Sequence, residues 1–434
     1  MKELLIISPN FPPINAADMH RVRQSLPYFR EMGWNPTVIA VEPQYVEMGQ
    51  DPWLLETIPD DIEIYRIPAF NTRWTRKFGL GNLGYRSLWY YRKLVKKLMK
   101  KKQFDLVYFS TTAFPVMTLG PCWQKKYGIP FIIDMQDPWR NDYYLTVPKD
   151  KRPPKFRIAY PMAKYLEAKT MVKVNGIISV SDGYPKTLME RYQNITQEMC
   201  TVIPFGGASI DFDVLDKLAL ENKLFKKDDG NIHTVYIGRG GHDMYFALKS
   251  AFLAVKEGLD RNPELYKRIR MYFIGTSYAL DGKGIKTIEP IAGEVGIPNL
   301  VQEITDRLPY FEAMNVLREA DMVFIPGSTD AQYTASKLYP YILSKRPLLA
   351  VFDGSSSVVE ILGRTRAGEC VTFTAGDTPE KVSRDVLEAL NHILEKLPFT
   401  PDTNWKEFEP YSAREMTRRQ VEFFEKTLTA WQKR

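Results

Sequence analysis

The chain has 434 residues, of which 44% are hydrophobic and 26% charged, and its formal net charge is +7. This length is beyond the size at which one hydrophobic core stops growing, so we expect two domains of about 200 residues. The apolar run at Met1 to Ile7 is too short for a signal peptide, and no other run approaches the roughly 20 residues of a membrane-spanning helix. Three scattered cysteines and four distant histidines lack metal-ligand or redox spacing, which favours a cytoplasmic protein without a structural metal.

Strand and helix patterns alternate along the first half of the chain. The apolar run Glu3 to Ile7 predicts a strand, and Ser8 to Pro13 predict a loop, because a helix cannot continue through these prolines. We expect further strands at residues 34–41, 62–67, 106–110, 131–134, 176–180 and 202–204, and helices from about residue 17 and at 88–102, 116–126 and 159–174. Strands separated by helices indicate a parallel sheet covered on both faces.

The alternation restarts after Gly206 to Ser209, which we interpret as a hinge. Strands are expected at residues 233–237, 270–274, 322–325 and 348–352, and helices at 245–256, 310–320, 337–344 and 380–395. Helix-forming residues with an apolar stripe fill 412–434. These patterns predict an α/β fold with two doubly wound parallel sheets: an N-terminal Rossmann-like domain at 1–205, a C-terminal Rossmann-like domain at 206–410, and a helical segment at 411–434 that packs back on the first domain.

Two loops in the second half carry residues that suit a phosphate ligand, and both follow expected strands, where open parallel sheets bind ligands. At Gly238 to Gly241 the glycines allow close backbone approach and Arg239 supplies a positive charge, which suits a diphosphate. Ser336 and Lys337 begin a helix whose free N–H groups would also attract phosphate oxygens. The simpler alternatives are a glycine-rich turn with a surface arginine and a well-capped helix.

A basic stretch lies in the first half of the chain. Residues 73–103 contain eleven Lys or Arg and no Asp or Glu, with aromatic and aliphatic residues interleaved. A basic amphipathic helix can lie on anionic lipid, so residues 73–102 are a candidate contact with the inner face of the plasma membrane. The alternative is a solvated helix that packs by its apolar side. We recognise no nucleic-acid-binding module and expect no nucleic-acid partner.

A set of short motifs is similar to a known family. They are Asp105 to Tyr108, Val202 to Gly206, Tyr236 to Arg239, Tyr272 to Gly275 and Ala320 to Pro326. In this order and spacing they resemble glycosyltransferase family 4, a large retaining family with the GT-B fold, over nearly the whole chain. The segment Ile133 to Trp139 is similar to the Asp-Pro-Trp loop of a bacterial branch of that family.

The resemblance implies a metal-independent hexosyltransferase, with two Rossmann-like domains facing a central cleft. It would move a sugar from a UDP- or GDP-linked donor to a glycan or lipid-linked acceptor, in cell-surface polysaccharide or glycoconjugate assembly, and need no cofactor. The catalytic residues it implies are Arg239, Lys337 and Asp137. The donor-binding residues are Gly238, Gly240, Gly241, Gly275, Thr276, Ser328, Asp330, Ser336, Leu338, Tyr341, Ala16 and Ala17. The acceptor-side residues are Asn15, Trp139, Phe205 and Gly206; the alternative for Asp137 and Trp139 is a helix-starting Asp and a packing Trp.

The chain departs from the family pattern in its first loop, in a lysine usually found about five residues after Arg239, where it has Asp243 and Met244, and in a pair of glutamates. Ala16 and Ala17 replace the paired glycines of the first loop, and their methyl groups hinder close approach to a donor. The two glutamates that the family spaces eight positions apart, the second of which binds the ribose, fall on Gln332 and Pro340. A proline side chain has no acceptor, so three interpretations are open: an altered donor, a ribose contact from Asp330 or Tyr341, or lost activity. A catalytically silent GT-B binding protein is therefore the main alternative, and a nucleotide-sugar 2-epimerase is a more distant one.

Overall fold

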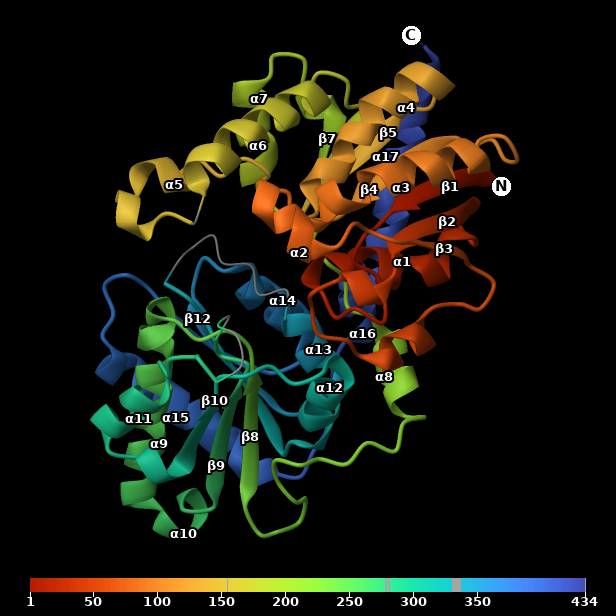
Figure 1. Ribbon diagram of the computed structural model, residues 1–434. Helices are drawn as coiled ribbons and strands as arrows, with labels where there is room; N and C mark the ends of the chain where they lie inside the picture. The colour runs from red at the N-terminus through yellow and green to blue at the C-terminus, as the bar shows by residue number, and fades with distance from the viewer. Residues whose placement is uncertain (154, 278, 280–281, 330–336, 434) are drawn as a thin grey trace. The chain divides into compact units, whose positions relative to one another are not determined.

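The computed structural model describes residues 1–434 except 154, 278, 280–281, 330–336 and 434 (Figure 1). Internal contacts divide the chain into two units: Met1–Gly206 with Ala413–Arg434, and Gly207–Ser412. Each unit has its own parallel sheet covered by helices. Among the helices described, we find none with the length and apolar character needed to span a membrane.

The first unit is built on a seven-stranded sheet with the order β3-β2-β1-β4-β5-β6-β7, in which every pair of neighbours is parallel. Its strands are β1 (Lys2–Ile7), β2 (Trp34–Val41), β3 (Glu63–Ile67), β4 (Leu106–Ser110), β5 (Phe131–Met135), β6 (Gly176–Ser179) and β7 (Cys200–Val202). Its helices are α1 (His20–Phe29), α2 (Thr72–Thr75), α3 (Leu83–Leu98), α4 (Leu119–Tyr127), α5 (Tyr143–Thr146), α6 (Phe156–Met171), α7 (Gly183–Arg191) and α17 (Ala413–Gln432).

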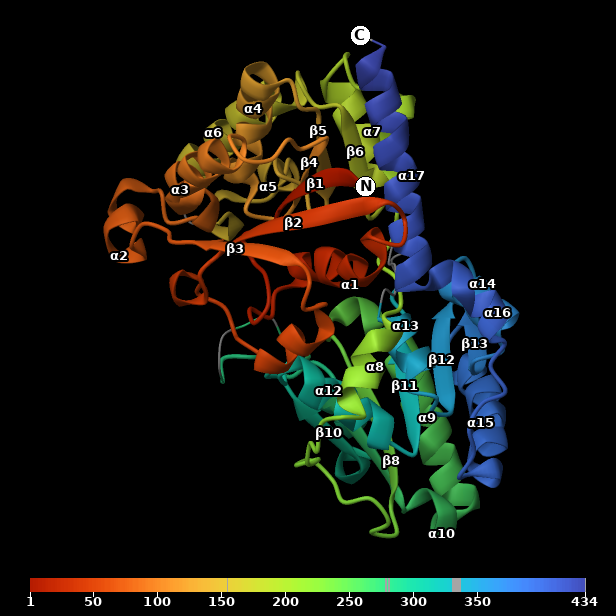
Figure 2. The ribbon, with the colours of Figure 1, turned by 90° about the vertical axis from the view of Figure 1, so that its right-hand side faces the viewer.

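Alternate residues of the strands of this sheet enter two different cores, as expected for a sheet buried on both faces. Leu5 and Ile7 pack with side chains of α3, α4 and α6. Leu4 and Ile6 on the opposite face pack with α1 and α17. Helix α17, drawn in blue, lies along the first unit in both views (Figures 1 and 2). Residues of α17, near the end of the chain, therefore share a core with β1 at its beginning.

The second unit has a six-stranded parallel sheet with the order β10-β9-β8-β11-β12-β13. Helices α9 and α15 pack together on one face of it, and α12 lies against β8 with α8 beside it. The strands are β8 (Ile232–Ile237), β9 (Ile269–Ile274), β10 (Val301–Ile304), β11 (Met322–Pro326), β12 (Leu348–Asp353) and β13 (Glu369–Phe373). The helices are α8 (Ser209–Leu215), α9 (Tyr245–Arg261), α10 (Pro263–Tyr266), α11 (Glu289–Val295), α12 (Tyr310–Glu319), α13 (Leu338–Leu343), α14 (Ser357–Thr365), α15 (Pro379–Lys396) and α16 (Trp405–Phe408).

Candidate functional site

The loop that follows β8 carries the glycines and the arginine singled out in the sequence. The Gly240 N–H donates to the carbonyl oxygen of Thr276 at 2.8 Å, which joins this loop to the end of β9. A Cβ atom on Gly240 would lie 2.5 Å from Thr287 Oγ1, closer than Cβ atoms normally approach. Gly275 at the end of β9 has φ of +72°, a conformation that glycine adopts at little cost. Two of the predicted glycines are therefore required by the way these two loops pack.

Arg239 is oriented by a carboxylate four residues later. Its two terminal nitrogens donate to the two oxygens of Asp243 at 2.9 and 2.6 Å. Ser328 Oγ, in the loop after β11, donates to the same carboxylate at 2.5 Å. The hydrogen bonds from Arg239, with that from Ser328, lower the pKa of Asp243 to about 2, so it is ionised at neutral pH. Ser328, predicted as a donor contact, thus helps to hold Arg239 through Asp243.

Lys337 directly precedes α13, and two other cations act on it. Part of the residue is exposed to solvent, yet surrounding protein atoms withdraw its ammonium group from water. This desolvation, together with repulsion from Arg307 and Arg239, lowers the pKa of Lys337 to about 8. Arg307 lies beside the end of β9, where a Cβ on Gly275 would be 3.5 Å from its Cγ. Arg239, Arg307 and Lys337 therefore form a cation cluster at the carboxyl edge of the second sheet.

Helix α13 holds two residues that the sequence suggested as donor contacts, and both are structural. Leu338 is fully buried. The Tyr341 hydroxyl accepts from the N–H of Ile237 at 2.6 Å and donates to the carbonyl oxygen of Ile237 at 3.1 Å. These two hydrogen bonds fasten α13 to β8, and a ribose contact by Tyr341 stays a prediction.

Pro340 is the third residue of α13, where no helical hydrogen bond needs its missing N–H. The predicted contacts Asp330 and Ser336, and Gln332 of the altered motif, lie outside the described residues.

Thr276 is also committed to the fold. Its hydroxyl donates to the buried Glu303 at 2.7 Å. Glu303 in turn accepts from the backbone N–H groups of Thr287, Ile288 and Glu289, which open α11. The buried carboxylate thus compensates three N–H donors at this helix start, and Thr276 contributes to the site through its backbone rather than through a hydroxyl available to a ligand.

The predicted loop of the first unit is organised around Asp18. Ala16 is buried, Ala17 is exposed, and the Asn15 N–H donates to the carbonyl oxygen of Gly49 at 2.9 Å. The buried Asp18 carboxylate accepts hydrogen bonds from a ring of polar groups on other segments: Asn10 Nδ2, Thr111 Oγ1, and both the N–H and Oγ1 of Thr112. This carboxylate, which the sequence analysis missed, ties the first loop to the end of β4.

A buried ion pair lies beside it. Arg21 Nε and Asp134 Oδ2 are 2.9 Å apart, and both side chains are inaccessible to solvent. Arg21 also donates to the carbonyl oxygen of Ile203 at 2.7 Å, and its guanidinium lies 4.8 Å from the ring centre of Phe205. Arg21 thereby fixes the segment that leads through Phe205 to the buried Gly206. The position of these two predicted acceptor-side residues is set within the first unit.

The Asp137 to Trp139 segment separates into two roles. Asp137 is exposed to solvent over part of its surface. Its carboxyl group is partly desolvated by surrounding protein atoms, and this desolvation, together with the nearby charge of Asp18, raises the pKa of Asp137. Trp139 is 8% exposed and stacks on Phe114, with ring centres 5.7 Å apart. The side chain of Trp139 belongs to the hydrophobic core of the first unit, and its acceptor-side assignment stays a prediction.

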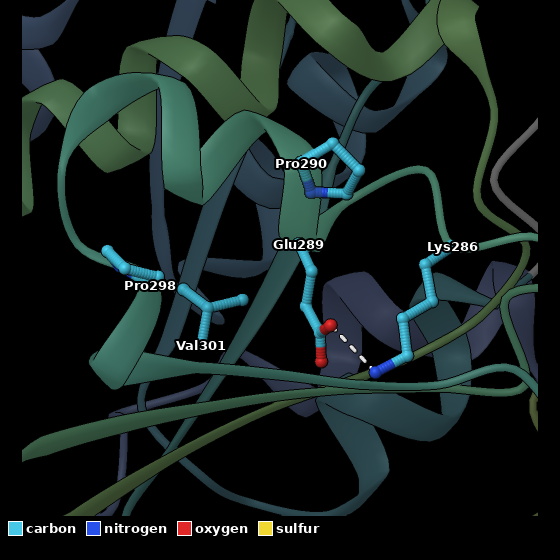
Figure 3. A pocket seen from close by; sticks show the side chains of 5 residues that line it. All are labelled: Lys286, Glu289, Pro290, Pro298 and Val301. Carbon is cyan, nitrogen blue, oxygen red and sulfur yellow. Dashed lines mark hydrogen bonds and ion pairs between the residues drawn. The ribbon is translucent and has the colours of Figure 1, made fainter.

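One hollow of the second unit, of about 420 Å³, contains none of the predicted site residues. It is lined by Lys286, Glu289, Pro290, Pro298 and Val301 (Figure 3). Lys286 and Glu289 form an ion pair at 2.7 Å in this hollow, which leaves no uncompensated charge to attract a phosphate. Among the residues that the structure describes, no group of three or more His, Cys, Asp or Glu could hold a metal ion.

The two sheets and their helices define the GT-B fold of glycosyltransferases, as predicted. Residues 21–206 match the family model described as Glycosyltransferase Family 4, which supports the family resemblance over most of the first unit. No curated protein matches the chain.

Solved structures with this fold include nucleotide-bound proteins. Anabaena Alr3699/HepE in complex with UDP is 12% identical, with a TM-score of 0.55 over 98% of this chain and 100% of that one. A glycosyltransferase from Rickettsia africae is 13% identical, with a TM-score of 0.53 over 98% and 99%. The α,α-trehalose 6-phosphate synthase from Burkholderia multivorans is 12% identical, with a TM-score of 0.56 over 99% and 100%. At these identities the likeness concerns the fold.

Proposed function

We propose that the chain is a retaining glycosyltransferase that takes a hexose from a UDP- or GDP-linked donor and transfers it to a glycan or lipid-linked acceptor. The observation that carries the proposal is the cation cluster of Arg239, Arg307 and Lys337 at the carboxyl edge of the second sheet. With Asp243 ionised, these four groups have a net charge of +2, which complements the two negative charges of a donor diphosphate.

The cluster would act mainly on the leaving group. Negative charge grows on the diphosphate as the bond to the sugar breaks, and fixed cations in a desolvated site stabilise that charge. Asp243 contributes by keeping Arg239 in one orientation before the donor arrives. In a retaining reaction of this type the acceptor hydroxyl attacks on the face that the diphosphate leaves, and a phosphate oxygen takes its proton. The reaction needs no cofactor and no metal.

Acceptor binding is assigned to the first unit, through Asp137 and the loop at Asn15. The partly desolvated carboxyl group of Asp137, whose pKa is raised by burial, is proposed to hold an acceptor hydroxyl by a hydrogen bond. An acceptor of cell-surface polysaccharide or glycoconjugate assembly fits this proposal.

A second candidate function is a catalytically silent binding protein. It is favoured by Pro340, which replaces the usual ribose-binding glutamate, and by the Tyr341 hydroxyl, which is committed to Ile237. Such a protein would bind a nucleotide or nucleotide sugar through the cation cluster without turning it over.

A panel of UDP- and GDP-sugars tests both functions. Thermal shift measures binding, and release of UDP or GDP, with and without a glycan or lipid-linked acceptor, measures turnover. We expect at least one donor to raise the melting temperature of the protein, and Arg239→Gln, Arg307→Gln and Lys337→Gln each to weaken its binding about tenfold or more. Arg384→Gln, an exposed change in the same unit, is the matched control.

The outcomes separate the two functions. Binding with turnover supports the transferase, and binding without turnover for any acceptor supports the silent protein. If no nucleotide or nucleotide sugar changes the melting temperature, the diphosphate assignment is wrong.

A further inference from the structure

Large apolar side chains are exposed on two segments of the first unit. One segment spans residues 70–93, with η4 (Arg76–Phe78) between α2 and α3, and the other spans residues 143–165, with α5 and the start of α6. Phe78 is 78% exposed, Ile158 68% and Trp74 67%. Tyr143, Tyr165 and Trp89 are likewise more than half exposed. Side chains of this size are normally buried in a folded domain, and a group of them on the surface is typical of an interaction site.

The two segments are adjacent in space. Lys155 Nζ, just before α6, donates to the carbonyl oxygen of Arg76 at 3.3 Å. Figure 2 shows α2, α3 and α6 on the same side of the first unit, with α2 at its edge. The exposed apolar groups of both segments therefore belong to one surface, which we call the aromatic-basic surface.

Side-chain contacts hold this surface in place. The Phe70 ring centre lies 5.2 Å from that of Tyr90, which fastens the segment before α2 to α3. Phe156 is 5.1 Å from Tyr160 and 6.0 Å from Tyr144 between ring centres, which fastens α5 to α6. These ring contacts anchor the two segments, so the exposed apolar side chains project from residues that are held to the rest of the first unit.

The charge of the surface has one sign. Residues 73–103 carry eleven Lys or Arg and no acid, and residues 143–165 carry six Lys or Arg and a single Asp. The rest of the chain has 42 Lys or Arg against 51 Asp or Glu, so the basic character of the protein is confined to these segments. On α3 and just after its end the exposed residues repeat at helical spacing and are mostly cations: Trp89, Arg92, Lys93, Lys96, Lys97 and Lys100.

We propose that the aromatic-basic surface docks the protein on a membrane that contains anionic phospholipid. The cations of α3 would contact phosphate headgroups, and the apolar side chains of Trp74, Phe78 and Ile158 would enter the boundary with the acyl chains. Aromatic rings with a polar edge prefer this interfacial zone. A nucleic acid would also attract the cations, but its phosphate backbone would not bury an exposed aliphatic side chain such as Ile158. The inference goes beyond the proposed function and holds whether or not the protein transfers a sugar.

Vesicle binding by the full chain tests the inference. We expect co-sedimentation with phosphatidylcholine vesicles that contain roughly 30% phosphatidylglycerol and little with pure phosphatidylcholine, and a fall in binding between about 20 and about 500 mM salt. Replacing Lys93, Lys96, Lys97 and Lys100 together by Gln should weaken binding to the anionic vesicles about tenfold or more. The double variant Phe78→Ser with Ile158→Ser should weaken it also at low salt, because it removes insertion without changing charge.

A charge-matched control replaces four exposed lysines of the second unit by Gln: Lys217, Lys226, Lys227 and Lys267. This control should bind anionic vesicles as the unchanged protein does. The inference is overturned if the unchanged protein ignores anionic vesicles at low salt, or if the control loses as much binding as the α3 variant. It is also overturned if single-stranded RNA binds the surface and lipid does not. Donor binding in the thermal-shift assay is independent of all these results, so failure here leaves the proposed function standing.

Discussion

Asp243 holds Arg239 by two parallel hydrogen bonds, one from each terminal nitrogen of the guanidinium. Through Ser328 the same carboxylate reaches the loop after β11, so the loops after β8 and β11 meet at this pair. The Asp243 carboxylate therefore lies next to Arg239, the cation that we propose binds the diphosphate of the donor. The carboxylate lowers the net charge of the cluster, and in return it restricts the arginine to one orientation.

We predict that Asp243→Asn weakens donor binding about tenfold, because the amide can accept through only one atom and Arg239 loses its two-point contact. Isothermal titration with the best-binding nucleotide sugar measures this. Asp228→Asn, an exposed change in the same unit, is the control. Unchanged affinity in Asp243→Asn would mean that the carboxylate does not position Arg239 for the donor.

Donor binding should depend on pH through Lys337. The pKa of Lys337 is lowered to about 8, so the ammonium form declines as the pH rises through 8 and affinity for a diphosphate falls with it. Lys337→Arg stays charged in this range, so its affinity should be nearly constant between pH 7 and 9, measured by titration at each pH. An equal decline in both proteins would assign the pH dependence to another group.

Lys337 also affects stability, with a definite sign. An unfolded chain binds the proton up to the ordinary lysine pKa, whereas the folded protein releases it near pH 8. Between these two pKa values the unfolded state binds more protons, so this group raises the free energy of unfolding as the pH increases from about 8. Lys337→Met should flatten that rise in denaturant titrations of the second unit.

Gly240→Ala should displace the loop after β8, because its Cβ would lie 2.5 Å from Thr287 Oγ1. We expect a lower melting temperature and weaker donor binding. Among the residues that the structure describes, the buried Thr287 Oγ1 has no hydrogen-bond partner, so its removal breaks no hydrogen bond there. The double variant Gly240→Ala with Thr287→Ala should therefore recover part of both losses in a double-mutant cycle. Additive effects of the two changes would show that the steric account is wrong.

Phe424→Ala should destabilise the first unit by about 3–5 kcal/mol, the usual cost of removing a buried aromatic side chain. Phe424 is fully buried, and its ring centre lies 5.5 Å from that of Trp34 on β2 and 5.2 Å from that of Tyr108 on β4. Urea unfolding followed by tryptophan fluorescence measures the change. Lys426→Ala, exposed on the same helix, should alter stability by less than about 0.5 kcal/mol.

The fold was predictable because most strands are buried runs of apolar residues separated by amphipathic helices. The strands β10 and β13 were missed, and both lie at an edge of the second sheet. Gln302 and Thr372 are exposed within them, so neither strand shows the continuous apolar run of a central parallel strand. An unbroken apolar run marks a strand that is buried on both faces of a sheet. The edge strands β10 and β13 are partly exposed, so they have no such run.

The candidate site was only partly predictable. The glycines and Arg239 could be found because each acts within its own loop. Arg307 was missed, because it follows the unpredicted strand β10 and reaches the cluster through the sheet order. The contacts of Trp139 and Tyr341 could not be predicted, because the surroundings of an aromatic side chain depend on residues distant in the sequence: Phe114 for Trp139 and Ile237 for Tyr341.

The path of the chain through the two units has a consequence for biosynthesis. The second unit, Gly207–Ser412, is one continuous insertion, whereas the first unit needs the residues after Ala413 to cover Leu4 and Ile6. Where the insertion begins and ends, the Gly207 N–H donates to the carbonyl oxygen of Tyr411 at 2.8 Å. During translation the second unit can therefore fold as soon as it leaves the ribosome, while the first unit, although made earlier, keeps the part of its core that α17 covers exposed until that helix emerges. The part synthesised first is therefore the part that completes its core last.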